Sequence, residues 1–268
     1  MNNIIKSSLF KLTKDLTFRI TLIIGAALAI FLNLLNFGLD ALVDLSSHTF
    51  CNAPSMLISS LSPAQNFGIA VPINLAVFTV NEFNHGTIRN KIIAGHKKSE
   101  IYISLLLIGL IFTFSLMIVY SAISTLFAGI LSGFAYIDTA CDPTLIVQYL
   151  LQAICVYIFI TTLSIFFATL FRSVGPTLPI LIVLILFCFF AGFLSQISTL
   201  FAEDTESIQL VSNMATWIDP LYTFGIFSLF IPDNIDTNWF IASIITPLYW
   251  ATIFGFSGLL IFIKRDVK

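Results

Sequence analysis

The chain has 268 residues, of which 58% are hydrophobic and only 10% are charged, and its formal net charge is −2 at pH 7. Soluble globular domains carry about a quarter charged residues, so this composition excludes an ordinary soluble protein. The mean hydropathy of +1.00 indicates an integral membrane protein.

Residues 1–19 form the first predicted element. Their apolar side chains recur at helical spacing with lysines between them, a pattern typical of a basic amphipathic helix lying on the inner leaflet. A cleavable secretory signal is the alternative, because residues 27–29 read Ala-Leu-Ala. The apolar run continues to Leu39, well beyond the roughly 7 to 15 residues of a signal core, so we expect a retained first span.

Six apolar stretches are near or above the length of about 20 residues that a helix needs to cross the hydrocarbon core. They also lack the alternation of polar and apolar residues that a membrane β-barrel requires. The sequence therefore predicts an all-α integral membrane protein, a single transmembrane domain over residues 1–268 with six transmembrane helices. The predicted spans are 20–39, 61–80, 101–129, 144–171, 177–197 and 239–263.

The charged residues orient these spans. All 12 basic residues fall on the side that holds both termini and the loop 81–100, and most acidic residues, Asp40 among them, are expected on the other side. Basic residues mark the cytoplasmic face, so both termini are predicted to be cytoplasmic. No ionisable side chain falls inside a predicted span, which disfavours a proton-coupled or ion-coupled carrier.

The loop 81–100, NEFNHGTIRNKIIAGHKKSE, is the one sizeable polar segment between spans that also carries positive charge. Gly86 permits a sharp turn, Thr87 can cap a helix over 88–94, and Gly95 can end that helix in the left-handed conformation. The helix would have about two turns, too short to be stable alone. It should therefore pack on something.

Ile88 and Ile92 lie one helical turn apart and are expected to present an apolar ridge, with Arg89 and Lys91 beside it. Glu82, at the end of the preceding span, is expected to pair with a cation such as Arg89 or Lys91. An ordinary basic cytoplasmic loop is the alternative interpretation of these residues.

The run 81–91, NEFNHGTIRNK, resembles the E-x-x-x-G-T-[IL]-[RK] signature in the first cytoplasmic loop of bacterial type-2 ABC exporter permeases, which include drug, bacitracin and lantibiotic-immunity exporters. The continuation IIAGHKKSEIYIS is similar to that family's short coupling helix and the start of its third span. Residues 219–222, Asp-Pro-Leu-Tyr, resemble the family's N-P-L-Y element. Two positions depart from the pattern: Leu105 stands where many members have lysine, and Asp219 replaces the usual asparagine.

The resemblance implies a permease subunit in the bacterial cytoplasmic membrane, exporting hydrophobic or amphipathic cargo such as antimicrobial peptides or drugs. A pathway that contains amides but no charges fits lipids as cargo as well. Its partners would be two copies of an ABC ATPase, a second permease copy, identical or paralogous, and the lipid bilayer, with no nucleic acid. The coupling residues implied are Glu82, Gly86, Thr87, Ile88, Arg89, Lys91, Ile92 and Ile93.

The sequence has no G-x-x-x-x-G-K-[ST] phosphate loop, no H-E-x-x-H motif and no plausible Ser/His/Asp set. We therefore expect no catalytic residue, no metal site and no cofactor in this chain, with ATP and Mg²⁺ bound by the partner subunit. A channel or passive pore, or a membrane sensor or assembly protein, remains the alternative to a transporter.

Amide side chains in the spans usually face other helices or a cavity, so they are candidates either for interhelical hydrogen bonds or for a substrate pathway. The candidates are Asn33, Asn36, Asn66, Asn74, Gln148 and Gln152.

Two further features belong to the predicted outer side. Cys51 and Cys141 lie in separate outer loops, where a disulfide can persist, yet two unpaired thiols are equally compatible with the sequence. The segment 198–238 contains two apolar stretches too short to span, which favour re-entrant or interfacial helices between spans five and six. They would form a lid over the pathway or anchor the last span.

Overall fold

The computed structural model describes residues 2–42, 53–63, 70–132, 143–201, 220 and 237–265. Every element in these ranges is an α-helix. The helices are α1 (Asn2–Lys14), α2 (Leu16–Leu42), α3 (Ala53–Leu61), α4 (Ala70–Asn84), α5 (Thr87–Ile93), α6 (Lys98–Ser132), α7 (Pro143–Phe171), α8 (Val174–Phe201) and α10 (Thr237–Lys264).

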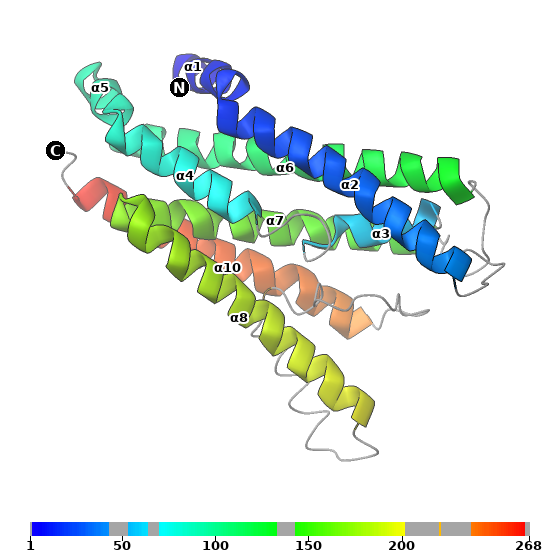
Figure 1. The fold of residues 1–268 in the computed structure, drawn as a ribbon. Coiled ribbons are helices and arrows are strands. Elements are labelled where there is room, and N and C mark those ends of the chain that lie inside the picture. Colours follow the sequence, from blue (N-terminus) through cyan, green and yellow to red (C-terminus); the bar gives the residue numbers. More distant parts are fainter. Residues whose placement is uncertain are drawn as a thin grey trace.

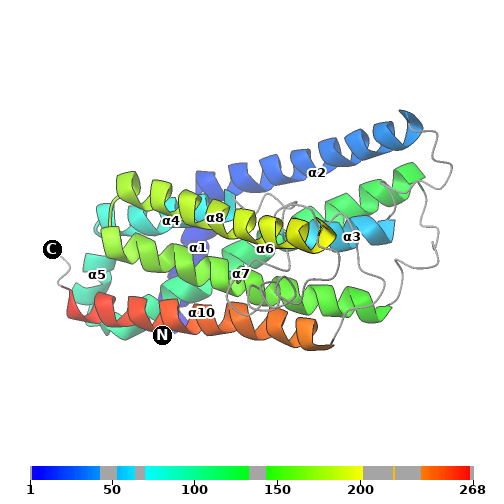
Figure 2. The same ribbon diagram turned by 90° about the horizontal axis from the view of Figure 1, so that it is seen from below.

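The helix α7 lies at the centre of the bundle (Figures 1 and 2) and contacts α3, α4, α6, α8 and α10. From Gln152 onward none of its side chains is exposed and most are apolar, as in Phe159 and Leu163, which is the pattern of a helix enclosed by other helices. The α6 helix packs tightly against it at Gly109, where an added Cβ would lie 2.8 Å from Cδ1 of Ile165. Only glycine fits that approach without displacing a side chain.

Four of the described helical segments are long and apolar enough to cross a membrane: Leu16–Ala41, Lys98–Ser132, Thr144–Phe171 and Phe240–Lys264. They agree with the predicted first, third, fourth and sixth spans and indicate a multi-pass membrane protein. In α8, the described apolar segment Val174–Cys188 is shorter, so the fifth span stays a prediction.

The predicted second span, 61–80, is described only in part. The α3 helix ends at Leu61, and α4 is described over Ala70–Asn84, so this span stays a prediction. Pro63 explains the end of α3, because proline lacks an amide proton and disfavours helical backbone in the residue before it. Both shorter helices pack on α7, and α3 also packs on α6.

Asp40, expected on the outer side, lies in the last turn of α2, because this helix continues three residues beyond the predicted end of the first span at Leu39. Asp40 lies within α2, is 1% exposed, and falls inside the apolar segment Leu16–Ala41. It follows Asn33 by two helical turns on the same face, and Asn33 Nδ2 donates to Ser124 Oγ of α6 at 3.0 Å. A buried acidic side chain therefore lies in the last turn of a candidate span, a position that makes an ion-coupled carrier worth testing.

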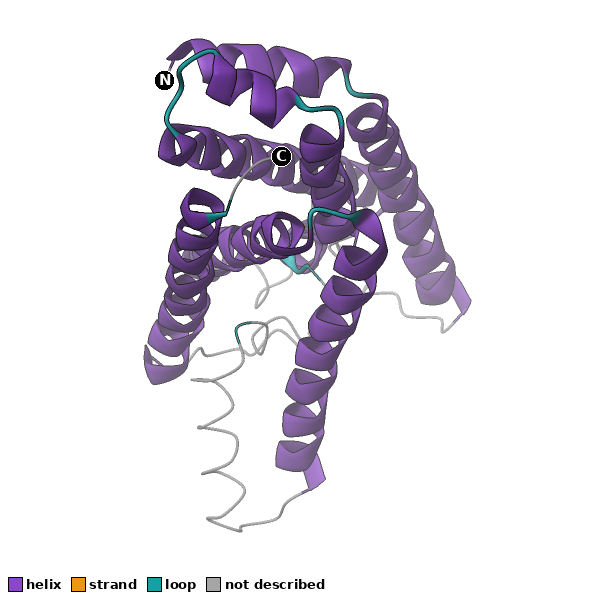
Figure 3. Cartoon of the chain, turned by 90° about the vertical axis from the view of Figure 1, so that its left-hand side faces the viewer, coloured by secondary structure: helices purple, strands orange, loops and turns teal. Residues whose placement is uncertain are grey.

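The predicted amphipathic helix 1–19 is divided at Asp15. The Asp15 side chain accepts hydrogen bonds from the Thr17 amide at 2.9 Å and the Thr17 hydroxyl at 2.7 Å, so it caps the start of α2. The α1 helix runs across the ends of the long helices, at the same end as the last turn of α10 (Figures 1 and 3). Leu12 and Ser8 of α1 face inward, whereas Phe10 is 67% exposed.

Several predicted features lie outside the described residues. These are Cys51, Cys141, Asn66 and most of the segment 198–238, whose first residues belong to α8. The disulfide and the outer helices therefore stay predictions.

Candidate functional site

The short helix predicted in the loop 81–100 is present as α5, over Thr87–Ile93. Gly86 precedes it with φ of 67°, and Gly95 follows it with φ of 88°. The Gly95 amide donates to the carbonyl of Ile92 at 2.9 Å and the His96 amide to that of Lys91 at 3.2 Å. These two bonds form a Schellman motif, so glycine sets both ends of α5.

Thr87 does not cap this helix as predicted. The N-cap position belongs to Gly86, and no side chain caps the helix there. The Thr87 hydroxyl instead lies 2.7 Å from the carbonyl oxygen of Glu82 and 2.8 Å from its Oε2, and donates to them. Thr87 therefore ties the first turn of α5 to the end of α4.

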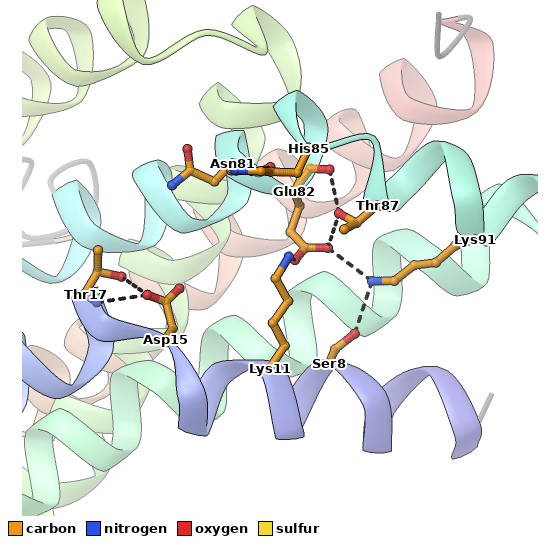
Figure 4. A network of polar contacts seen from close by, with 9 residues as sticks. All are labelled: Ser8, Lys11, Asp15, Thr17, Asn81, Glu82, His85, Thr87 and Lys91. Atoms are coloured by element: carbon orange, nitrogen blue, oxygen red, sulfur yellow. Dashed lines mark hydrogen bonds and ion pairs between the residues drawn. The ribbon is translucent and has the colours of Figure 1, made fainter.

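Glu82 is the centre of a polar cluster that joins three helices (Figure 4). Its side chain is only 3% exposed, and Lys11 of α1 donates to its Oε1. Lys91 of α5 lies 3.3 Å from Oε2 and donates to Ser8 of α1 at 3.1 Å. We call Ser8, Lys11, Glu82, Thr87 and Lys91 the Glu82 cluster.

The Glu82 cluster was predicted only in part. Lys91 makes the expected ion pair, whereas Arg89, the other candidate, is exposed to solvent. The contact with Lys11 was missed because the two residues lie 71 positions apart. The lysine spacing within α1 shows that the helix is amphipathic but not which lysine faces α4.

The environment of Glu82 acts on its pKa in both directions. Burial raises the pKa and is the largest single influence, but the hydrogen bond from Lys11, the charge of Lys91, the hydrogen bond from Thr87 and the charge of Lys11 together lower it further. The net pKa lies below the ordinary value of 4.5. Glu82 is therefore ionised at neutral pH.

Other cations at this end of the bundle bind the last carbonyl groups of neighbouring helices. Lys98, at the start of α6, donates to the carbonyls of Ile263 at 3.0 Å and Arg265 at 3.3 Å, and Arg265 donates to the carbonyl of Leu170 in α7. Arg172, which follows α7, lies 5.4 Å from the ring centroid of Phe83 in α4. Positive charge is favourable at the carboxyl end of a helix. These contacts therefore help to hold the ends of α4, α6, α7 and α10 together near α5.

The apolar ridge expected on the outside of α5 faces inward. Ile88 is 0% exposed and belongs to the main hydrophobic core, and Ile92 packs against that core. The exposed apolar side chain is Ile93, at 73%, and Arg89 and Asn90 are exposed beside it. The packing that the two-turn helix needed thus comes from this chain itself. We call Arg89, Asn90 and Ile93 the outer face of α5.

Among the described amide candidates, the three asparagines make hydrogen bonds, whereas Gln148 and Gln152 have buried amide atoms without a hydrogen-bond partner. Asn33 bonds to Ser124, and Asn36 Nδ2 lies 3.8 Å from Met56 Sδ of α3. Asn74 bonds within its own helix, to the carbonyl of Ala70 at 2.9 Å. These contacts agree with the interhelical or local bonding expected as the alternative to a substrate pathway.

Comparison of the chain with protein-family models, with curated proteins and with solved structures finds no significant match in any of the three.

Proposed function

We propose that this protein is the permease subunit of an ATP-driven exporter of the type-2 ABC class, with the outer face of α5 as the docking surface for a separate ATPase. One observation carries the proposal. A two-turn helix, delimited by Gly86 and Gly95, is fixed from behind by Ile88 and the Glu82 cluster and exposes Arg89, Asn90 and Ile93. Because α5 is packed against the rest of the chain, a partner that binds its exposed face and moves would displace the neighbouring helices with it.

The contacts of α5 with α4 and α1 would transmit a displacement of α5 to the long helices. A displacement of α5 acts on Glu82 in α4 through Thr87 and Lys91 and on α1 through Lys91 and Ser8. The α4 helix packs on the central helix α7, and α1 packs on α6. Ion pairs and packed helices of this kind can couple distant sites when both belong to one two-state element.

The proposal includes the remaining parts of such an assembly. The end that holds α1, α5 and the Glu82 cluster would face the cytoplasm of a bacterial cell, because the described basic residues gather there. Two ATPase subunits would bind ATP and Mg²⁺, and a second permease copy, identical or paralogous, would complete the pathway. Six crossings require that α8 and the region of α3 and α4 also traverse the membrane.

An ion-coupled carrier is the second candidate, since Asp40 is a buried acid inside a candidate span. Ionisable residues at such positions often belong to proton or ion pathways. Transport that persists without ATP and is abolished by Asp40→Asn would favour this candidate over the exporter.

The docking surface can be tested with Ile93→Asp and Arg89→Glu. Both changes alter exposed side chains and should leave the fold intact, whereas a charge or a charge reversal at the centre of an interface should weaken binding of the ATPase at least about tenfold. The measurement is the amount of a P-loop ATPase, identified by mass spectrometry, that co-purifies with the tagged chain in mild detergent. Lys6→Glu, an equal charge reversal at an exposed position of α1, is the matched control. Unchanged recovery of the ATPase with both α5 variants would rule out this docking surface.

A further inference from the structure

Unpaired polar atoms concentrate on the central helix. Gln152 is 0% exposed, and neither its Nε2 nor its Oε1 has a hydrogen-bond partner in the described structure. One helical turn earlier, Oε1 of Gln148 is also buried and without a partner. Buried side-chain amides in folded proteins are nearly always hydrogen-bonded. Two neighbouring glutamines with buried amide atoms that lack a partner are therefore unusual.

The amide nitrogens of α2 differ from that of Gln152. Asn33 Nδ2 donates to Ser124 of α6, and Asn36 Nδ2 lies 3.8 Å from Met56 Sδ of α3. Gln152 is fully buried, and its helix α7 is in contact with α3, α4, α6, α8 and α10. Neither lipid nor a second copy of the chain can reach it unless the bundle opens. A partner for this amide could reach it only if α7 separated from a neighbouring helix.

We propose that Gln152, assisted by Gln148, is a recognition site for the peptide groups of an uncharged apolar peptide cargo. This rests on the proposed function, since it assigns the cargo of the same export pathway. An amide side chain offers two donor protons and an acceptor oxygen without carrying charge. A backbone peptide group offers the complementary donor and acceptor. The unsatisfied resting state favours cargo binding, because binding supplies the hydrogen bonds that the closed bundle lacks.

Binding can be measured on the full-length chain in lipid nanodiscs, without any ATPase. The probe is a radiolabelled tetraleucine peptide, acetylated and amidated at its ends, and the comparison ligand is the same peptide with every backbone nitrogen methylated, which removes its donors. Wild-type protein should bind the first peptide at least about tenfold more tightly than the second, and Gln152→Leu should lose that preference. Ser115→Ala, which removes a hydroxyl bonded within α6, is the control and should retain it. Equal binding of the two peptides by wild type, or an unchanged preference in Gln152→Leu, overturns the proposal.

A stability measurement separates recognition from a structural role. If the Gln152 amide is unsatisfied in the resting protein, Gln152→Leu and Gln152→Met should both raise the midpoint of thermal unfolding in detergent, because they remove a buried polar group that has no partner. If the amide makes a structural bond, both variants should lower the midpoint, which overturns the proposal. Neither experiment involves an ATPase, so a failure here is distinct from a failure of the docking surface on α5.

Discussion

Replacing Lys11 and Lys91 together by methionine is expected to reverse the pH dependence of the protein's stability. In the wild type, the folded-state pKa of Glu82 lies below its ordinary value of 4.5. Its contribution to stability is therefore present above about pH 4.5 and is lost as the pH falls through the folded pKa. Without the two lysines, burial, which is the largest influence and raises the pKa, is opposed mainly by Thr87.

The folded pKa of the double variant should then lie above 4.5. Its stability is highest below pH 4.5 and falls as the pH rises through the new pKa. At neutral pH, the unpaired carboxylate should cost about 3 to 5 kcal/mol relative to wild type. Thermal unfolding midpoints in detergent between pH 4 and pH 8 provide the measurement.

Two controls isolate Glu82 as the titrating group. Adding Glu82→Gln to the double variant should abolish the inverted pH dependence, and Lys6→Met at an exposed position of α1 should leave the wild-type profile unchanged. If the double variant and the wild type give parallel profiles, Glu82 is not held ionised by these lysines.

The second large effect is expected at Ile88. Ile88→Ala should destabilise the protein by about 2 to 5 kcal/mol, the usual cost of truncating a fully buried isoleucine, because its side chain is 0% exposed within the core. Ile93→Ala, a change of the same chemistry on the same helix, should alter stability by less than about 0.5 kcal/mol because that side chain is 73% exposed.

Chemical denaturation of the two variants in the same detergent measures this difference. An acidic residue at position 88 would disturb folding as well as docking, so a variant at Ile88 does not test ATPase binding alone. Equal unfolding free energies for the two variants would show that α5 does not pack as described.

Local features of α5 could be predicted well from the sequence. Gly86 and Gly95 are the residues that turns of left-handed conformation require, and they bound the helix closely. The side of the helix that faces the core could not be predicted in the same way. Ile88, Ile92 and Ile93 are all apolar, and their spacing alone does not show whether the rest of the chain or a partner covers them.

The helical segments that correspond to spans one, three, four and six were predictable because each is a long apolar run. Hydropathy did not indicate that α3 ends at Leu61, because an average over a window hides the local effect of Pro63. Hydropathy also placed the end of the first span at Leu39, whereas α2 continues to Leu42 and includes the buried Asp40. The pairing of Lys11 with Glu82 depends on how α1 folds back, which no local pattern encodes.

Site-specific photocrosslinking from position 93 tests the exporter assignment most directly. A photoreactive amino acid replaces Ile93, whose side chain is 73% exposed on the outer face of α5, and intact cells are irradiated before the tagged chain is purified under denaturing conditions. The proposed function predicts a crosslinked polypeptide with a G-x-x-x-x-G-K-[ST] phosphate loop, identified by mass spectrometry, and loss of that product when Arg89→Glu is present. Crosslinks to lipid alone, or to no ATP-binding protein, would contradict it.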